Sequence, residues 1–572
     1  MAILNDYLFY DQKKLCVCQV AEKLMVMILR NCYNLSAIPD LSKHQTLEKL
    51  VLERCLSLIK IHESIGNVST LLHLNLGHCS NLIEFPAEVS GLKNLEILIL
   101  SGCTKLKELP NDIGSMRSLK ELLVDDTAIA MLPESIFRLT KLENLSLNGC
   151  QFLGRLPNCI GKLSSLKEFS LNGSAINEIP CSVGTLVNLE KLSLMWCKSL
   201  TSIPDSVGNL ISLTELLTNG SAIKELPASI GSLSYLKALS VGNCQFLSKL
   251  PDSIEGLGSV VELQLDGTSI TNLPDRVGAL KMLRKLEMRN CKSLGSLPES
   301  IGSMLALTAL NLFNANISEL PESIGMLENL IILRMNKCTQ LCKLPASIGN
   351  LKSLHHLHME ETAVTELPES FGMLSSLMTL KMAKKSPFQL SGKSVPEKVL
   401  AATAQEKRNP GTLPTSFSNL CLLEELNARA WKLCGKIPDD FEKLSSLEIL
   451  NLGHNNFFSL PSSLRGLSIL KKLVLPYCQE LKSLPPLPSS LLEVNVANCT
   501  ALERVSDLSS LESLCELNLT NCEKVVDIPG LECLKSLTRL FMTGCKTCSS
   551  VVKGRLSKVF SPPLLIRLHF SY

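Results

Sequence analysis

A nine-residue pattern of leucines, closed by a small residue, recurs along almost the whole chain. One copy is marked by Leu95, Leu98, Leu100 and Cys103. The spacing between copies is mostly 23 or 24 residues, and the chain holds 22 of them. A unit of this length cannot bury its own apolar face, so neighbouring units must stack into one continuous core. The ninth positions are residues 32, 55, 79, 103, 127, 150, 174, 197, 221, 244, 268, 291, 315, 338, 362, 385, 431, 455, 478, 499, 522 and 545.

Each residue of the pattern has a structural role. The leucines at its first, fourth and sixth positions predict a short strand whose apolar side chains point into the core. Successive strands then pair in parallel through right-handed crossovers. A Leu-Pro pair such as Leu109-Pro110 predicts a short helical turn, because proline fixes φ. We expect the following Ile-Gly pair, as in Ile160-Gly161, to close that turn, with the glycine just past its end.

This spacing is typical of leucine-rich repeats. The predicted fold is therefore an α/β solenoid, a leucine-rich-repeat horseshoe or superhelix of about 22 repeats. We expect its parallel β-sheet to line the concave face and short helical or irregular segments to form the convex face.

Cysteine occupies the ninth position in 13 of the 22 repeats. Between residues 103 and 362, Cys repeats alternate with Thr, Ser or Ala repeats, which makes a 47-residue pair the true unit. A small side chain fits where the chain turns inward, but Lys385 and Trp431 break this rule. Because the cysteines recur within a repeat of a long chain, we expect reduced, buried thiols. The predicted ladder consists of Cys55, Cys79, Cys103, Cys150, Cys197, Cys244, Cys291 and Cys338.

The repeat rhythm divides the chain into five parts. Repeats made of paired 23- and 24-residue units occupy residues 24–383, and further repeats occupy residues 413–549. Between them lies an insertion, residues 384–412, with six basic and two acidic residues. It is either a solvated loop or an island that contributes to partner binding, since long insertions in such arrays are often functional. Residues 1–23 and 550–572 lack the pattern.

The composition of the chain argues against several classes of function. The 572 residues include 57 Lys+Arg and 54 Asp+Glu, a formal net charge of +3, which argues against a nucleic-acid binder. The longest apolar run, Leu24 to Leu29, is far too short to span a membrane. The first residues lack the order of charge and hydrophobicity of a signal peptide. We therefore expect a protein of the cytoplasm, or of the nucleus, without a membrane span.

One short motif imitates a phosphate-binding loop. Gly392-Lys393-Ser394 matches the end of that motif, but its first glycine should stand at position 387, where the chain has Pro387. No strand–loop–helix pattern surrounds it, so we predict no nucleotide site.

Two further groups of side chains resemble metal-binding sites. Cys545 and Cys548 form a lone pair without partners at zinc spacing. His356 and His358 lie on one expected strand and share its outward face, where they fit better as residues of a binding surface than as metal ligands. No arrangement of nucleophile, base or paired carboxylates emerges. We predict no cofactor, no metal and no enzymatic activity.

The outward-facing strand positions are the candidate binding surface. Between residues 287 and 381 these positions are mostly charged or ionisable, and the stretch before them carries a rare pair of exposed apolar residues. Arginine and tryptophan are favoured anchors in protein interfaces. The candidate residues are Met195, Trp196, Glu287, Arg289, Phe313, Arg334, His356, His358 and Lys381.

Residues 21–549 resemble the leucine-rich repeats of plant intracellular immune receptors. The resemblance rests on SGCTKLKELP, LPESIGMLENL and above all LPPLPSSLLEVNVANCTALERVSDLSSLESLCELNLTNCEKVVDIPGLECLKSL. The nearest class is the TIR–nucleotide-binding–leucine-rich-repeat disease-resistance proteins. The resemblance implies a region that senses pathogen effectors and restrains an ATP/ADP switch. No TIR or nucleotide-binding domain is recognisable in this sequence.

These features favour a non-enzymatic recognition module of plant innate immunity. Its partner would be a pathogen effector or a guarded host protein, together with the TIR and nucleotide-binding domains of a full-length receptor. Three alternatives remain open. The chain could be an intracellular scaffold of the small-GTPase or phosphatase-adaptor type, a cell-surface receptor ectodomain, or a truncated paralogue without activity.

Overall fold

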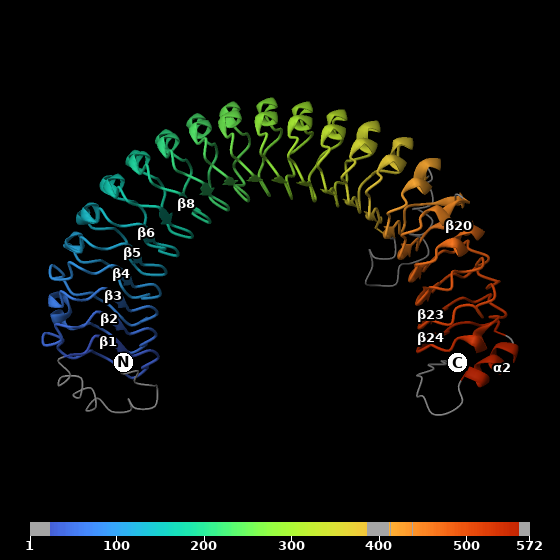
Figure 1. The fold of residues 1–572 in the computed structure, drawn as a ribbon, viewed down its shortest axis with the longest axis horizontal. Helices are drawn as coiled ribbons and strands as arrows, with labels where there is room; N and C mark the ends of the chain where they lie inside the picture. The colour runs from blue at the N-terminus through green and yellow to red at the C-terminus, as the bar shows by residue number, and fades with distance from the viewer. Residues whose placement is uncertain (1–22, 386–410, 412, 438, 549, 560–572) are drawn as a thin grey trace, which may run out of the picture. The chain divides into compact units, whose positions relative to one another are not determined.

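The computed structural model describes residues 23–385, 411, 413–437, 439–548 and 550–559. The chain divides into two compact units at the boundary between Glu287 and Met288. In each unit the strands lie on one side and short 3₁₀ helices, labelled η, lie on the other (Figure 1). The predicted stack of parallel strands with short helical segments opposite is confirmed. The predicted parts 1–23 and 384–412 fall almost entirely outside the described residues, as does 560–572 of the predicted tail.

Within residues 23–287, the first unit contains twelve three-residue strands, each paired in parallel with the next. The strands are β1 (Val26–Ile28), β2 (Lys49–Val51), β3 (His73–Asn75), β4 (Ile97–Ile99), β5 (Glu121–Leu123), β6 (Asn144–Ser146), β7 (Glu168–Ser170), β8 (Lys191–Ser193), β9 (Glu215–Leu217), β10 (Ala238–Ser240), β11 (Glu262–Gln264) and β12 (Lys285–Glu287). The 3₁₀ helices are η2 (Glu63–Asn67), η3 (Ile113–Ser115), η4 (Glu134–Arg138), η5 (Asn158–Lys162), η6 (Cys181–Thr185), η7 (Asp205–Asn209), η8 (Ala228–Ser232), η9 (Asp252–Gly256) and η10 (Asp275–Ala279).

The second unit continues the same architecture. Its main sheet consists of β13 (Ala309–Asn311), β14 (Ile332–Arg334), β15 (His356–His358), β16 (Thr379–Lys381), β17 (Glu425–Asn427), β19 (Ile449–Asn451), β21 (Lys472–Val474), β22 (Glu493–Asn495), β23 (Glu516–Asn518) and β24 (Arg539–Phe541). A separate parallel pair is formed by β18 (Cys434–Lys436) and β20 (Asn456–Ser459). The helices are η11 (Glu299–Ser303), η12 (Glu322–Met326), η13 (Ala346–Asn350), η14 (Glu369–Met373), η16 (Thr415–Asn419), η17 (Phe441–Lys443), η18 (Ser462–Gly466), η19 (Leu531–Cys533) and α2 (Ser550–Val559).

The glycine of the Ile-Gly pair has a different role from the one predicted. Gly161 lies inside η5 and not past its end, and proline directly precedes the helix, as Pro157 does for η5. A Cβ atom on Gly161 would lie 2.0 Å from the carbonyl oxygen of Ser182 in the next repeat. The glycine is therefore needed because η5 and η6 approach each other closely, not because it ends a turn.

The ninth-position cysteines connect consecutive repeats. The Sγ of Cys103 donates to the backbone oxygen of Leu76 in the preceding repeat at 3.2 Å. The hydroxyl of Thr127 instead donates within its own repeat, to the oxygen of Val124 at 2.9 Å. All eight predicted ladder cysteines are buried and carry free thiols. Burial raises the pKa of Cys103 to about 12, which keeps that thiol protonated and able to donate.

At the root of the insertion, the side chain that turns inward is Lys384 and not Lys385. The ammonium of Lys384 donates to the backbone oxygens of Thr362 and Val364. It also lies 4.5 Å from the ring centroid of Trp431, which is only 1% exposed. Burial, with a smaller contribution from Lys432, lowers the pKa of Lys384 to about 7. The ring of Trp431 is buried and contacts Lys384, but its Nε1 has no hydrogen-bond partner within the described residues.

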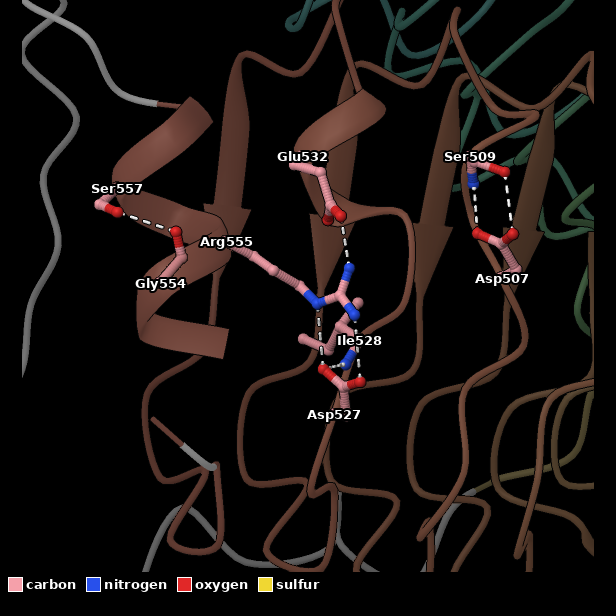
Figure 2. A network of polar contacts seen from close by, with 8 residues as sticks. All are labelled: Asp507, Ser509, Asp527, Ile528, Glu532, Gly554, Arg555 and Ser557. Carbon is pink, nitrogen blue, oxygen red and sulfur yellow. Dashed lines mark hydrogen bonds and ion pairs between the residues drawn. The ribbon is translucent and has the colours of Figure 1, made fainter. Parts of the chain in front are cut away.

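The helix α2 packs against η19, behind the last strand. Figure 2 shows Arg555 reaching from α2 to two acidic residues of the repeat that precedes the last one. Its Nε lies 3.3 Å from a carboxylate oxygen of Asp527, and its Nη1 contacts Glu532. These two ion pairs of Arg555 hold α2 against the repeats.

Candidate protein-binding surfaces

Five neighbouring strands of the second unit bring a row of polar side chains together. The third positions of β13 to β17 lie directly opposite one another in register. Parallel strands are about 4.8 Å apart, so the side chains of this row are immediate neighbours. The middle residue of each strand is buried, whereas the first and third positions face the open side of the sheet. The row consists of Asn311, Arg334, His358, Lys381 and Asn427.

In this row the uncharged imidazole of His358 lies between two cationic side chains. Arg334 is exposed, and the Nζ of Lys381 lies 3.2 Å from a carboxylate oxygen of Glu425. Burial, followed by the charges of Lys381 and Arg334, lowers the pKa of His358 to about 4. Burial and the neighbouring His355 also lower the pKa of His356. At neutral pH both imidazoles are uncharged and can donate or accept a hydrogen bond.

The depressed pKa of His358 predicts a pH dependence of stability. Since the unfolded imidazole titrates near its ordinary pKa of about 6.5, the unfolded state binds more protons between that pH and about 4. The stability that the neutral His358 contributes is therefore fully present above about pH 6.5, and it is lost as the pH drops toward 4. We expect His358→Asn to lose less stability over this range than the wild type. Urea unfolding midpoints measured at pH 7, 5.5 and 4 check this, and His78→Asn at an exposed histidine serves as the control. If the midpoint depends on pH equally in His358→Asn and in the wild type, the prediction is contradicted.

The chain just beyond the strands adds to this surface. The amide of Asn336 donates to a carboxylate oxygen of Glu360 at 2.6 Å, and burial raises the pKa of Glu360. Phe313 is half-buried, with the Nζ of Lys337 5.3 Å from its ring centroid. The surface therefore carries an aromatic ring and both signs of charge within one unit.

The first unit carries a hollow of about 400 Å³ beside Trp196. Trp196 is 53% exposed, and Phe246, which also lines the hollow, is 62% exposed. Trp196 covers Gly220, where a Cβ atom would lie 2.2 Å from the indole ring. The hollow is lined by Trp196, Lys198, Gly220, Ser221, Ala222, Asn243, Gln245 and Phe246.

Trp196 has an unusual backbone conformation for a bulky residue. Its φ is +61°, in the left-handed region. The same position of other repeats also has a positive φ, most often with Gly or Asn, as at Gly220 and Asn243, but also with large side chains such as Tyr477. A large side chain costs free energy in this region, on the order of 1–3 kcal/mol. Strain of this kind is typical of functional positions.

Of the remaining predicted site residues, two are accessible to solvent and one is buried. Arg289 is exposed, and Met195 is half-buried next to Trp196. The expectation that Glu287 is open to solvent is wrong, because it is 7% exposed. Lys285 of its own strand lies 3.6 Å from its carboxylate, and Gln264 of β11 lies opposite it in register.

Sequence reasoning did not identify Phe246 or Glu425. The signal for Phe246 was present, because Cys244-Gln245-Phe246 places an aromatic residue just past a ladder cysteine. Glu425 gave no such signal, because its pairing with Lys381 depends on β17 following β16 across the insertion.

Neither a metal centre nor a membrane segment is found in the part of the chain that the structure describes. Within those residues, no three His, Cys, Asp or Glu side chains form a group able to hold a metal ion. The helices among them are all too short or too polar to cross a bilayer. The Gly392–Ser394 motif lies outside the described residues.

Comparison with known proteins agrees with the geometry. The family model described as "Leucine-rich repeat region" matches residues 27–153, and that described as "Leucine Rich Repeat" matches residues 446–467. The chain is a leucine-rich-repeat solenoid.

Its repeats resemble those of plant disease-resistance proteins. TMV resistance protein N of Nicotiana glutinosa is 43% identical over 84 residues, which is 14% of this chain and 7% of that protein.

Two proteins of Arabidopsis thaliana show a similar likeness to this leucine-rich-repeat chain. A probable disease resistance protein is 39% identical over 70 residues, 12% of this chain and 4% of its own length. A disease resistance-like protein is 42% identical over 72 residues, 13% of this chain and 6% of its own length. The matched segments therefore span only a small fraction of these relatives.

Solved structures show the same leucine-rich-repeat fold. A TDR receptor has a TM-score of 0.53 at 21% identity, covering 89% of this chain and 82% of its own. A leucine-rich-repeat protein of Leptospira interrogans has a TM-score of 0.52 at 24% identity, covering 77% of this chain and 94% of its own. At these identities the likeness concerns the fold.

Proposed function

We propose that this leucine-rich-repeat chain is a non-enzymatic recognition module of plant innate immunity, which binds a pathogen effector or a guarded host protein. One observation carries the proposal: Trp196 is exposed at a left-handed backbone position that Asn or Gly would occupy without strain. A residue kept there against its conformational cost is best explained by a contact with a partner. The likeness to plant disease-resistance proteins supplies the biological class.

Binding would use two surfaces, one in each unit. In the hollow beside Trp196, an apolar side chain of the partner would insert between the indole and Phe246, with Lys198 at its edge. Aromatic residues around a pocket are typical binding hot spots. Across β13 to β17, Arg334 and the neutral imidazole of His358 would hydrogen-bond to polar groups of the partner.

The proposal extends to the context of the chain. In a full-length receptor, partner binding would release the restraint that the repeats exert on a nucleotide switch. The chain would act in the cytoplasm or the nucleus, and its partners would include the TIR and nucleotide-binding domains of that receptor. The insertion 384–412, with six basic residues, would contribute a further contact.

The test is a binding screen that separates recognition from folding. The purified chain is screened by biolayer interferometry against purified effector proteins secreted by plant pathogens. For an effector that binds, we expect Trp196→Asn to weaken the affinity at least tenfold, about 1.4 kcal/mol. The same substitution should leave the chain as stable as the wild type or more so, because Asn tolerates the left-handed conformation.

Two matched variants complete this screen. Tyr235→Ala removes another aromatic side chain of the first unit, 65% exposed and outside the hollow, and should leave the affinity unchanged. Arg334→Ala should weaken binding, whereas Arg276→Ala in η10 on the other side of the sheet should not. Equal affinities of Trp196→Asn, Arg334→Ala and wild type for every bound effector would refute the proposed surfaces.

A further inference from the structure

The last repeat differs from the others at its twelfth position. In the other Cys repeats this position, three residues after the cysteine, holds a buried leucine or valine. Leu106 follows Cys103 in this way, and Leu502 follows Cys499. In the last repeat the twelfth residue is Cys548, three residues after Cys545. A thiol thus replaces an apolar side chain at the point where the array of repeats ends.

The backbone places these two cysteines at the two ends of one turn. Residues 545–548 form a turn, and the first and fourth Cα atoms of such a turn lie within about 7 Å. Disulfides join Cα atoms about 4.4–6.8 Å apart. The Sγ of Cys545 donates to the backbone oxygen of Leu519 at 3.2 Å, which fixes its position. Both cysteines are half-buried, unlike the fully buried Cys522 one repeat earlier.

The pKa values of the two thiols are also shifted in opposite directions. The side chains of Cys545 and Cys548 interact with each other. This interaction lowers the pKa of Cys548 to about 7, although burial and the charge of Asp527 oppose the shift. The same interaction, together with burial, raises the pKa of Cys545. By contrast, burial raises the pKa of Cys522 to about 11. Of these thiols, Cys548 is the one that carries a substantial thiolate fraction at neutral pH.

We propose that Cys545 and Cys548 form a redox modification site, at which a hydroperoxide converts the two thiols into an intramolecular disulfide. The thiolate of Cys548 attacks one peroxide oxygen; an S–O bond forms, the O–O bond breaks, and hydroxide leaves. The sulfur of Cys545 then attacks the sulfenic sulfur, an S–S bond forms, and water leaves. With hydrogen peroxide, two thiols are oxidised by two electrons and the peroxide is reduced to two water molecules.

Oxidation would alter the end of the second unit. The disulfide removes the S–H group that Cys545 donates to the oxygen of Leu519. The modified turn lies in the last repeat, next to the repeat in which Asp527 holds Arg555 of α2 (Figure 2). The site needs no partner protein and is independent of the proposed recognition function.

The experiment uses the full chain and peptide mass spectrometry. The reduced protein is treated with a limiting amount of hydrogen peroxide at pH 7, alkylated, and digested. We expect the Cys545–Cys548 disulfide to be the first oxidation product and to disappear on reduction with dithiothreitol. The exposed Cys181 and Cys434 of the same sample serve as internal controls and should remain alkylated as free thiols.

The pH profile of alkylation gives a second readout. At pH 7, a thiol with a pKa of about 7 is half thiolate, against about 3% for a pKa of about 8.5. Lower basicity reduces nucleophilicity, so we expect only about threefold faster iodoacetamide labelling of Cys548 than of Cys181, with a midpoint near pH 7. Cys548→Leu restores the residue type of the other repeats and should fold normally without forming the disulfide. A midpoint at the ordinary thiol pKa, or oxidation of Cys181 and Cys434 before the pair, would overturn the proposal.

Discussion

Leu192→Asp is expected to unfold the first unit around β8. The leucine side chain is fully buried and lies opposite Phe169 on β7 and Leu216 on β9. Removing a buried leucine costs about 2–5 kcal/mol, and an unpaired carboxylate in the same place costs several kcal/mol more. The sum is comparable with the whole stability of an ordinary domain, about 5–15 kcal/mol. Because repeats depend on their nearest neighbours, we expect unfolding to begin locally.

Limited proteolysis combined with thermal unfolding checks this expectation. Leu192→Asp should melt at a lower temperature and should be cleaved early between β7 and β9. The control is Leu192→Met, which keeps the volume and the apolar character and should cost less than about 1.5 kcal/mol. A melting curve and a cleavage pattern of Leu192→Asp identical to those of the wild type would show that β8 does not hold the core as described.

The strands could be predicted because their signal is local and repeated. The spacing of Leu189, Leu192 and Leu194 defines both the strand and its buried face, and all three side chains are buried. Since the repeat length is nearly constant, the pattern also predicts which residues lie side by side on neighbouring strands. Arg334, His358 and Lys381 lie opposite one another in register for this reason.

The features that sequence reasoning missed depend on contacts between repeats. The exposure of Glu287 is set by its neighbours Gln264 and Lys285, which the pattern of its own repeat does not specify. Lys384 turns inward because the ring of Trp431, 47 residues later in the chain, lies beside it. Such contacts involve side-chain conformations and the path of an insertion, neither of which has a periodic signature.

The candidate binding surfaces were predicted in part for the same reason. The exposure of Trp196 could be expected from its place between strand and ladder cysteine. Its left-handed backbone conformation and the hollow it shares with Phe246 could not, because they require two repeats to be placed together. The neutral state of His358 likewise arises from burial and from charges on the two adjacent strands.

Gly161→Ala is expected to destabilise the first unit strongly although it adds a single methyl group. Its Cβ would lie 2.0 Å from the backbone oxygen of Ser182 and 2.4 Å from the Oγ1 of Thr185. Because the nearest atom belongs to the backbone, no rotamer change relieves the clash, and η5 must move away from η6. The hydroxyl of Thr185, which donates to the oxygen of Gly161 at 2.6 Å, would be displaced as well. Overpacking of this kind costs about 1–3 kcal/mol and occasionally more.

Gly154 is the matched control in the same repeat. No atom lies within 4 Å of a Cβ built on Gly154, so Gly154→Ala should be neutral or should stabilise by about 0.4–1 kcal/mol through the unfolded chain. Urea unfolding of both variants measures the difference directly. A similar small effect of both substitutions would mean that the 3₁₀ helices can separate freely. A loss confined to Gly161→Ala means that the spacing of η5 and η6 is set by backbone contact at this glycine.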